Sequence, residues 1–132
     1  MRKILFVALM LVSAPAMAAP DAAMSKGMAQ CSVLFADEAR LAHEHNSPDN
    51  QKSFETASAG FLIGAMAYAP GSNDEAIAAI DGWKAEYAAS VAGLTAEQAK
   101  AKYLECEVLE PKVTEVVQAI KASQAQQQQG QQ

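Results

Sequence analysis

The fold of this chain depends most on one apolar run, Phe54-Glu-Thr-Ala-Ser-Ala-Gly-Phe-Leu-Ile-Gly-Ala-Met-Ala-Tyr-Ala69. Most of its apolar residues recur at three- and four-residue steps, which is the spacing of one face of a helix. Ile63 and Met66 point elsewhere, so this helix must be covered on most of its sides. The run is shorter than the roughly 20 residues that a membrane span needs, and Glu55 lies near its start. We therefore expect a central core helix rather than a membrane or lipid-binding segment.

Two glycines in this run, Gly60 and Gly64, stand four residues apart. They remove side-chain bulk along one line of the helix, so a second helix can approach closely there. The same spacing is known from dimers of membrane helices. In this chain it predicts tight packing inside a bundle.

Residues 1–18 have the pattern of a signal peptide. Arg2 and Lys3 precede an apolar run over residues 4–12, and Ala16-Met17-Ala18 has the small-x-small form of a cleavage site. We expect cleavage after Ala18, without a lipid anchor, because no cysteine follows the apolar run. The remaining chain has no second long apolar stretch, so we expect no stable membrane insertion. The predicted location is the bacterial periplasm or the medium.

The charge of the chain argues against two classes of partner. The formal net charge is −5, and loss of Arg2 and Lys3 with the signal peptide makes it −5 − 2 = −7. Acidic residues are scattered along the chain and form no block. Nucleic acids and anionic membranes both reward clustered lysine and arginine, so neither is expected as a partner.

Cys31 and Cys106 are the two cysteines of the chain. In an oxidising compartment an even number of cysteines indicates a disulfide, and two cysteines allow one pairing. Closing a loop of about 75 residues stabilises a fold by roughly 4–5 kcal/mol in the chain-entropy model. A redox pair or a metal site is the alternative, but neither cysteine has a second Cys or a His at ligand spacing. We predict a structural disulfide.

Apolar periodicity and capping signals predict four helices. The first runs from near Asp21 to about His45, the second from Ser47-Pro48 to Pro70, the third from Ser72 to Gly93, and the fourth begins at Thr95. Ser72 with Glu75 and Thr95 with Gln98 both have capping-box spacing. Pro111 is expected to kink or split the last helix after Leu109.

These elements predict an all-α fold, namely a small antiparallel four-helix bundle tied by one disulfide. The helical domain is expected over residues 19–122, and the Gln-rich residues 123–132 are expected to form a disordered tail. Cys31 and Cys106 each fall about midway along an outer helix. The first and last helices are neighbours in an up-down-up-down bundle, so the predicted disulfide agrees with this arrangement.

The residues that could carry chemistry do not form a catalytic pattern. The chain has no Gly-x-Ser-x-Gly motif, no glycine-rich phosphate loop and no Cys-x-x-Cys-His motif. Glu105, Glu107 and Glu110 lie around Cys106, and we interpret them as a solvated face. Glu38 lies near the apolar stripe of the first helix, either at its edge or as a buried carboxyl. We expect neither an enzyme nor a cofactor.

His43 and His45 form, with Glu44 between them, the one cluster of metal-ligand type. Residues two apart point to opposite sides of a helix, so both imidazoles could hold one ion only if the helix end frays. The alternative is a polar helix end whose imidazoles interact with terminal carbonyls. We expect no metal site and keep the two histidines as weak candidates.

Three resemblances to exported proteins rest on short stretches. Leu94-Thr95-Ala96-Glu97-Gln98 resembles the Leu-Thr-x-x-Gln motif of the Spy/CpxP periplasmic chaperones, which bind other chains on an apolar surface. Size, export, helicity and one disulfide are similar to those of acid-stress chaperones of the HdeA type, without a shared motif. The order of Gly60–Ala69, Leu94–Gln98 and Tyr103-Leu104 resembles that in the Rap/Tai immunity proteins of type VI secretion, whose further cysteines this chain lacks. No family's site residues are transferred from these matches.

The hypothesis that follows is an exported, non-catalytic helical protein that binds another protein. A stress chaperone could be gated by acid through Glu38, His43 and His45, whereas an immunity or inhibitor protein could use Trp83 or Tyr87 as aromatic anchors. A metal or small-ligand carrier, using the two histidines or the bundle interior, is the alternative from another class. The sequence predicts neither the partner nor the oligomeric state.

Overall fold

The computed structural model describes residues 19–130, and these residues form four α-helices and no strand. The helices are α2 (Ala22–Glu44), α3 (Pro48–Tyr68), α4 (Asn73–Val91) and α5 (Ala96–Gly130). Their bounds lie within a few residues of the predicted ones. The predicted signal peptide, residues 1–18, lies outside the described residues, as do residues 131 and 132.

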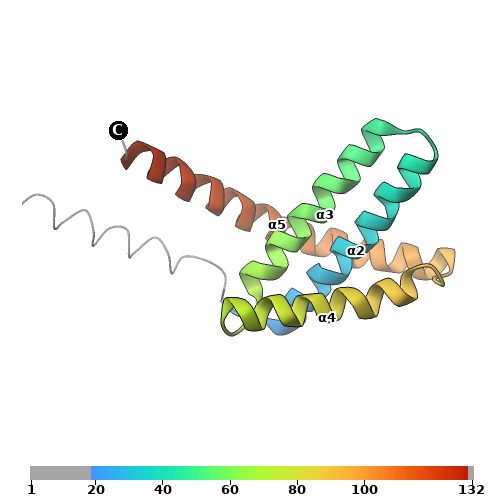
Figure 1. Cartoon of the computed structure of the whole chain (residues 1–132), viewed down its shortest axis with the longest axis horizontal. Coiled ribbons are helices and arrows are strands. Elements are labelled where there is room, and N and C mark those ends of the chain that lie inside the picture. Colours follow the sequence, from blue (N-terminus) through green and yellow to red (C-terminus); the bar gives the residue numbers. More distant parts are fainter. Residues whose placement is uncertain (1–18, 131–132) are drawn as a thin grey trace, which may run out of the picture.

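The predicted all-α bundle tied by one disulfide is confirmed, with α2 at its centre. Helix α2 pairs along α3 in an antiparallel hairpin, and it also contacts α4 and α5 (Figure 1). Helix α5 packs against α3 as well, whereas α3 and α4 make a smaller contact. In Figure 1, α4 crosses below the hairpin and α5 crosses behind it. The core therefore lies where the helices cross α2, and the tip of the hairpin projects away from it.

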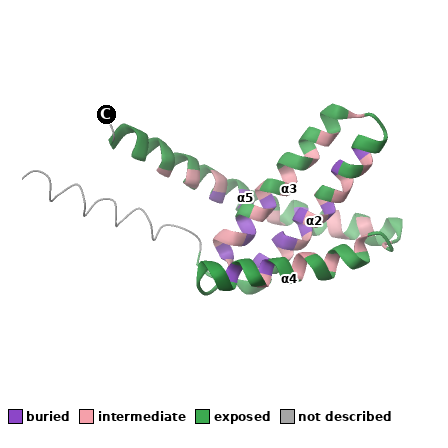
Figure 2. Ribbon diagram, in the orientation of Figure 1, coloured by how far each residue is buried: buried purple, intermediate pink, exposed green. Residues whose placement is uncertain are grey.

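The buried residues gather at this crossing (Figure 2). The principal core cluster contains buried side chains of all four helices: Met28, Ala29, Cys31, Leu34, Phe61, Ala65, Tyr68, Ile80, Cys106, Val113 and Val116. Phe61, Ala65 and Tyr68 come from the apolar run Phe54–Ala69. That run therefore contributes to the core, but it is not the central helix that the sequence predicted. Helix α2 has that place, and Ile63 on the other side of α3 is 41% exposed.

Close packing at Gly64 confirms the prediction made from the glycine spacing, whereas Gly60 does not need to be a glycine for lack of space. A Cβ atom built on Gly64 would lie 2.7 Å from the Met28 Sδ atom and 3.1 Å from the Val113 Cγ2 atom. A Cβ atom on Gly60 would lie 3.4 Å from the Val113 Cγ1 atom, which is an ordinary contact. Gly64 therefore allows α3 to approach both α2 and α5.

Serine hydroxyls connect α2 to α3 along the hairpin. Ser25 on α2 donates to the Ala65 carbonyl oxygen at 2.7 Å, and Ser58 on α3 donates to the Ser32 carbonyl oxygen, also at 2.7 Å. Each bond leaves the helix's own ladder intact, because a carbonyl oxygen has two lone pairs. These buried or half-buried bonds fix the register of the hairpin.

Capping interactions explain where three of the helices begin. Asp21 accepts from the Met24 backbone N–H at 3.0 Å, and Ser72 accepts from the Glu75 N–H at 3.2 Å. Thr95 and Gln98 form both bonds of the predicted capping box, at 3.0 and 3.1 Å. Ser47 caps α3 without a side-chain hydrogen bond.

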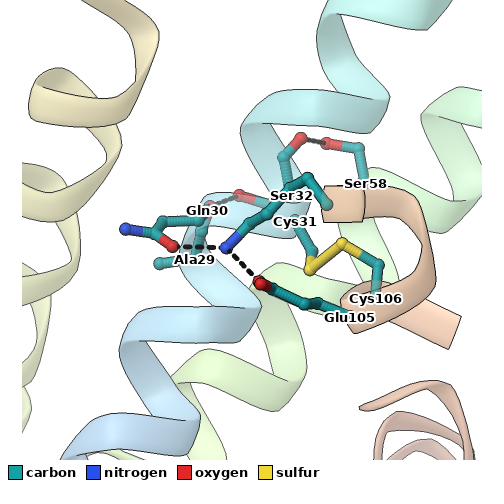
Figure 3. The surroundings of a disulfide bond; sticks show 8 residues. Ala29, Gln30, Cys31, Ser32, Ser58, Glu105 and Cys106 are labelled. Carbon is teal, nitrogen blue, oxygen red and sulfur yellow. Dashed lines mark hydrogen bonds and ion pairs between the residues drawn. A yellow bond between two sulfur atoms is a disulfide. The ribbon is translucent and has the colours of Figure 1, made fainter. Parts of the chain in front are cut away.

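The predicted disulfide between Cys31 and Cys106 is present, with the two Cα atoms 5.8 Å apart (Figure 3). Both residues are buried, and the bond joins α2 to α5. Beside it, Lys102 on α5 donates to Gln30 at 2.6 Å and to Glu105 at 3.1 Å. The covalent link is thus accompanied by a polar link between the same two helices.

Helix α5 agrees with its prediction at Pro111 and differs from it at its C-terminal end. It is not split at Pro111, which lies inside it; Pro111 is exposed, so water can reach the carbonyl that the missing proline N–H leaves free. The two halves of α5 follow different directions in Figure 1, as a kink requires. Residues 123–130 continue the helix instead of forming a disordered tail. Glutamine and alanine are good helix formers, and extending an existing helix is easier than starting one.

Within residues 19–130, none of the helices combines the length and the apolar character that a membrane crossing demands.

Candidate functional site

The largest hollow among those described on this fold is a groove formed by α2, α3 and α4, with a cavity volume of about 610 Å³. We call it the α2–α3 groove. Its lining residues are Ser32, Val33, Ala36, Ala39, Arg40 and His43 of α2, Gln51, Glu55, Ser58, Ala59 and Leu62 of α3, and Lys84 of α4.

Small side chains form the floor of the α2–α3 groove. Ala36 and Ala39 come from α2 and Ala59 from α3, and alanine leaves space between two helices that larger residues would fill. Ala36 and Ala59 are exposed, whereas Ala39 is buried. The floor is therefore apolar, open to solvent and built on rigid helices.

Polar side chains form the rim of the groove. Arg40 makes ion pairs with Asp37 at 2.8 Å and with Glu44 at 2.6 Å. Across the opening, the His43 Nδ1 atom lies 3.2 Å from the Gln51 Oε1 atom, and Gln51 donates to Glu55 at 3.0 Å. The rim thus carries both signs of charge and hydrogen-bonding groups on both helices.

The two histidines proposed as weak metal candidates lie in different cavities. His43 lines the α2–α3 groove, whereas His45 lines a hollow of about 300 Å³ that also includes Glu38 and Phe54. Within residues 19–130 no group of three or more His, Cys, Asp or Glu side chains is placed to hold a metal ion. The structure therefore does not bring the two imidazoles together.

The two aromatic residues proposed as partner anchors are half-buried and pack against the core from α4. The Lys102 Nζ atom lies 5.4 Å from the centre of the Tyr87 ring. The Tyr87 hydroxyl is buried and has no hydrogen-bond partner among residues 19–130. Burial, followed by the charge of Glu105, raises its pKa. Trp83 and Tyr87 thus stabilise the packing of α4 against the core. Their role in binding a partner stays a prediction.

Glu38 is half-buried, at the edge of the α2 stripe rather than deep within the core. The pKa of its neighbour Tyr103 is raised. The largest cause is burial, followed by a hydrogen bond to Glu38 and by the charges of Glu38 and Asp37. The Tyr103 phenol of α5 therefore lies close to the Glu38 carboxylate of α2.

The groups that could serve acid–base or nucleophilic chemistry are dispersed. Glu105, Glu107 and Glu110 are all exposed on α5, as the sequence predicted for a solvated face. Ser25 and Ser58 donate to backbone carbonyls of the neighbouring helix. The α2–α3 groove is therefore better suited to binding a ligand or a partner than to acid–base or nucleophilic chemistry.

The α2–α3 groove could not be predicted from the sequence. Its floor consists of alanines at the margins of the apolar stripes, and alanine suits both a core and a surface. Whether such an alanine is buried in a core or exposed in a groove depends on how the helices cross.

A comparison of this chain with protein-family models, with curated proteins and with solved structures found no match.

Proposed function

We propose that this chain is an exported, non-catalytic protein that binds another protein in the α2–α3 groove. The observation that carries the proposal is the form of the groove, an apolar floor of small side chains between two rims of mixed charge. Protein interfaces commonly combine an apolar centre that excludes water with a polar border that fixes orientation.

The shape of the groove favours one kind of occupant. Its walls are two helices, and a third helix laid between them would place its apolar residues on Ala36 and Ala59. Recognition of an amphipathic helix by a hydrophobic groove is a recurrent mode of protein binding. Arg40, Glu55 and Lys84 would then select the register of the bound helix through its charges.

Export supports a partner outside the cytoplasm. A fully buried disulfide is typical of proteins that fold in an oxidising compartment, and the signal-peptide pattern of residues 1–18 leads to the same compartment. The proposed location is the periplasm of the producing bacterium.

Site-specific photocrosslinking tests the proposal. A photoreactive amino acid is placed at Ala59, on the groove floor, and in a matched variant at Ala88, which is exposed on α4 and does not line the groove. In the native host we expect a discrete adduct from position 59 alone. Identical adducts from both positions, or none from position 59, would contradict the proposal.

A binding measurement with the identified partner completes the test. Ala59→Arg fills the groove with a long charged side chain and is expected to weaken binding at least about tenfold, or by 1.4 kcal/mol. Ala88→Arg adds the same charge elsewhere and is expected to leave the affinity unchanged. Circular dichroism checks that both variants remain folded.

A chaperone that binds many unfolded chains is the second candidate. Leu104 and Val108, one turn apart on α5, are 53% and 77% exposed, so they form an apolar strip outside the groove. For an acid-gated chaperone, binding of a dye specific for apolar surface should rise between pH 7 and pH 3, together with suppression of client aggregation. If neither changes, the single-partner version stands alone.

A further inference from the structure

A second cavity, of about 330 Å³, lies between α2, α3 and α5 and shares no lining residue with the α2–α3 groove. We call it the aromatic cavity. Its lining residues are four aromatic side chains, Phe35, Phe54, Phe61 and Tyr103, together with Ala57, Cys106, Glu107 and Glu110. Its volume is at the lower end of the range of small-molecule sites.

The aromatic side chains form one connected cluster around Phe35. The centre of its ring lies 5.4 Å from that of Phe61 and 6.2 Å from that of Phe54, in stacked arrangements, and 5.7 Å from that of Tyr103, which meets it edge-on. Because the other three rings all pack against Phe35, the cluster is held together without a ligand. The cavity is therefore lined by ordered aromatic side chains, and the faces of aromatic rings carry partial negative charge.

Two carboxylates accompany the rings. Glu107 and Glu110 both line the cavity and both are exposed on α5. In the part of the chain that the structure describes, neither carboxylate forms an ion pair or a hydrogen bond. The cation of the chain that does approach an aromatic ring, Lys102, lies over Tyr87 and not over a ring of this cavity.

We propose that the aromatic cavity binds a small organic cation of the quaternary ammonium type. Such a cation is attracted by ring faces and by the two carboxylates at the same time. It carries no N–H group, so it loses no hydrogen bond when apolar walls surround it, whereas a metal ion would lose tightly held water. The proposal is independent of the protein-binding role of the α2–α3 groove.

Calorimetry with a pair of matched ligands tests the proposal on the oxidised mature chain. Choline carries a trimethylammonium group, and 3,3-dimethylbutan-1-ol has the same shape with a neutral carbon in place of the nitrogen. We expect saturable binding of choline with a Kd near or below about 1 mM, and binding of the neutral analogue at least about fivefold weaker.

Two variants place the bound cation in the aromatic cavity. Glu107→Gln/Glu110→Gln removes both carboxylates and is expected to weaken choline binding at least about fivefold. The control, Glu86→Gln/Glu97→Gln, changes the net charge equally at exposed positions outside the cavity and is expected to have little effect. Phe54→Leu keeps an apolar wall without a ring and is expected to weaken binding about 2- to 30-fold.

The two natural sources of this chemistry are a free cation and a lipid headgroup. Cosedimentation with phosphatidylcholine vesicles, lost in Glu107→Gln/Glu110→Gln, would support the proposal and identify a lipid as the source. Choline binding without cosedimentation would support it and identify a free cation. Equal affinity for choline and its neutral analogue, equal affinity of the two double variants, or no binding up to about 50 mM choline would overturn it.

Discussion

Gly64 is the residue on which the packing of α3 depends most directly. An added methyl group would lie 2.7 Å from the Met28 Sδ atom and 3.1 Å from Val113. Met28 is completely buried, so its side chain cannot move aside without disturbing the core. We predict that Gly64→Ala lowers the free energy of unfolding by about 1–3 kcal/mol, measured by urea denaturation.

Gly60 provides the matched control, because it lies one turn earlier on the same helix. A methyl group there would meet Val113 at 3.4 Å, which is an ordinary contact. Gly60→Ala should be neutral or should stabilise the protein by up to about 1 kcal/mol, the difference in helix propensity. Equal destabilisation by the two substitutions would show that the close approach at Gly64 is not the cause.

Tyr103 should make the stability of the protein depend on pH in alkaline solution. Its pKa in the folded state is raised above the ordinary value of about 10 by burial, by its hydrogen bond to Glu38 and by nearby carboxylates. A group whose pKa is raised on folding stabilises the fold below its unfolded pKa, and this stability is lost as the pH rises further. We predict that the free energy of unfolding falls above about pH 10 and that Tyr103→Phe reduces the fall.

Tyr87→Phe is the comparison for this measurement. The pKa of Tyr87 is also raised, by burial and by Glu105, but its hydroxyl has no hydrogen-bond partner in the part of the chain that the structure describes. At pH 7, Tyr103→Phe should therefore destabilise the protein, whereas Tyr87→Phe should be neutral or slightly stabilising. A larger loss for Tyr87→Phe would contradict this assignment of the two hydroxyls.

The start of α5 offers a test at the scale of one element. Thr95 and Gln98 satisfy two backbone N–H groups reciprocally, and loss of such a cap destabilises a helix. Thr95→Ala should lower the free energy of unfolding by about 1 kcal/mol. Ser47→Ala is the control, because Ser47 makes no capping hydrogen bond; it should change the stability by less than about half as much. Thermal unfolding followed by circular dichroism measures both.

Helix positions could be predicted because their signals are local. Asp21, Ser72 and Thr95 act as N-caps where the sequence indicated them, since a cap involves only its next three residues. One expectation for α5 was not met. Residues 123–130 continue the helix, because glutamine and alanine favour a helix even where they contribute nothing to the core.

The candidate sites could not be predicted in the same way. Ala36 and Ala59 are 23 positions apart, and Phe35 and Tyr103 are 68 positions apart. Whether such residues form a floor or a wall depends on how the helices cross, and the sequence does not specify a crossing angle. The glycine spacing did predict the close approach of another helix at Gly64, and the cysteine count did predict the Cys31–Cys106 disulfide, because two cysteines allow one pairing.

At the scale of the whole molecule, the disulfide closes a loop whose ends are 75 positions apart and joins the central helix to the last one. We predict that its reduction lowers the free energy of unfolding by about 4–5 kcal/mol, measured by urea denaturation with and without a phosphine reductant. The Cys31→Ala/Cys106→Ala variant should be similarly weakened and should not respond to the reductant. An unchanged midpoint for the reduced protein would contradict this.

The same bond leaves the folded chain without a free thiol for a thiol-alkylating reagent. The chain has two cysteines in all; both are consumed, and both are covered. A maleimide added together with a reductant can therefore label only molecules that have unfolded enough to expose the two cysteines. The rate of labelling then measures the rate of this unfolding. A cysteine introduced on the surface would be the single place to attach a fluorophore, so encounters with a binding partner could be watched one molecule at a time.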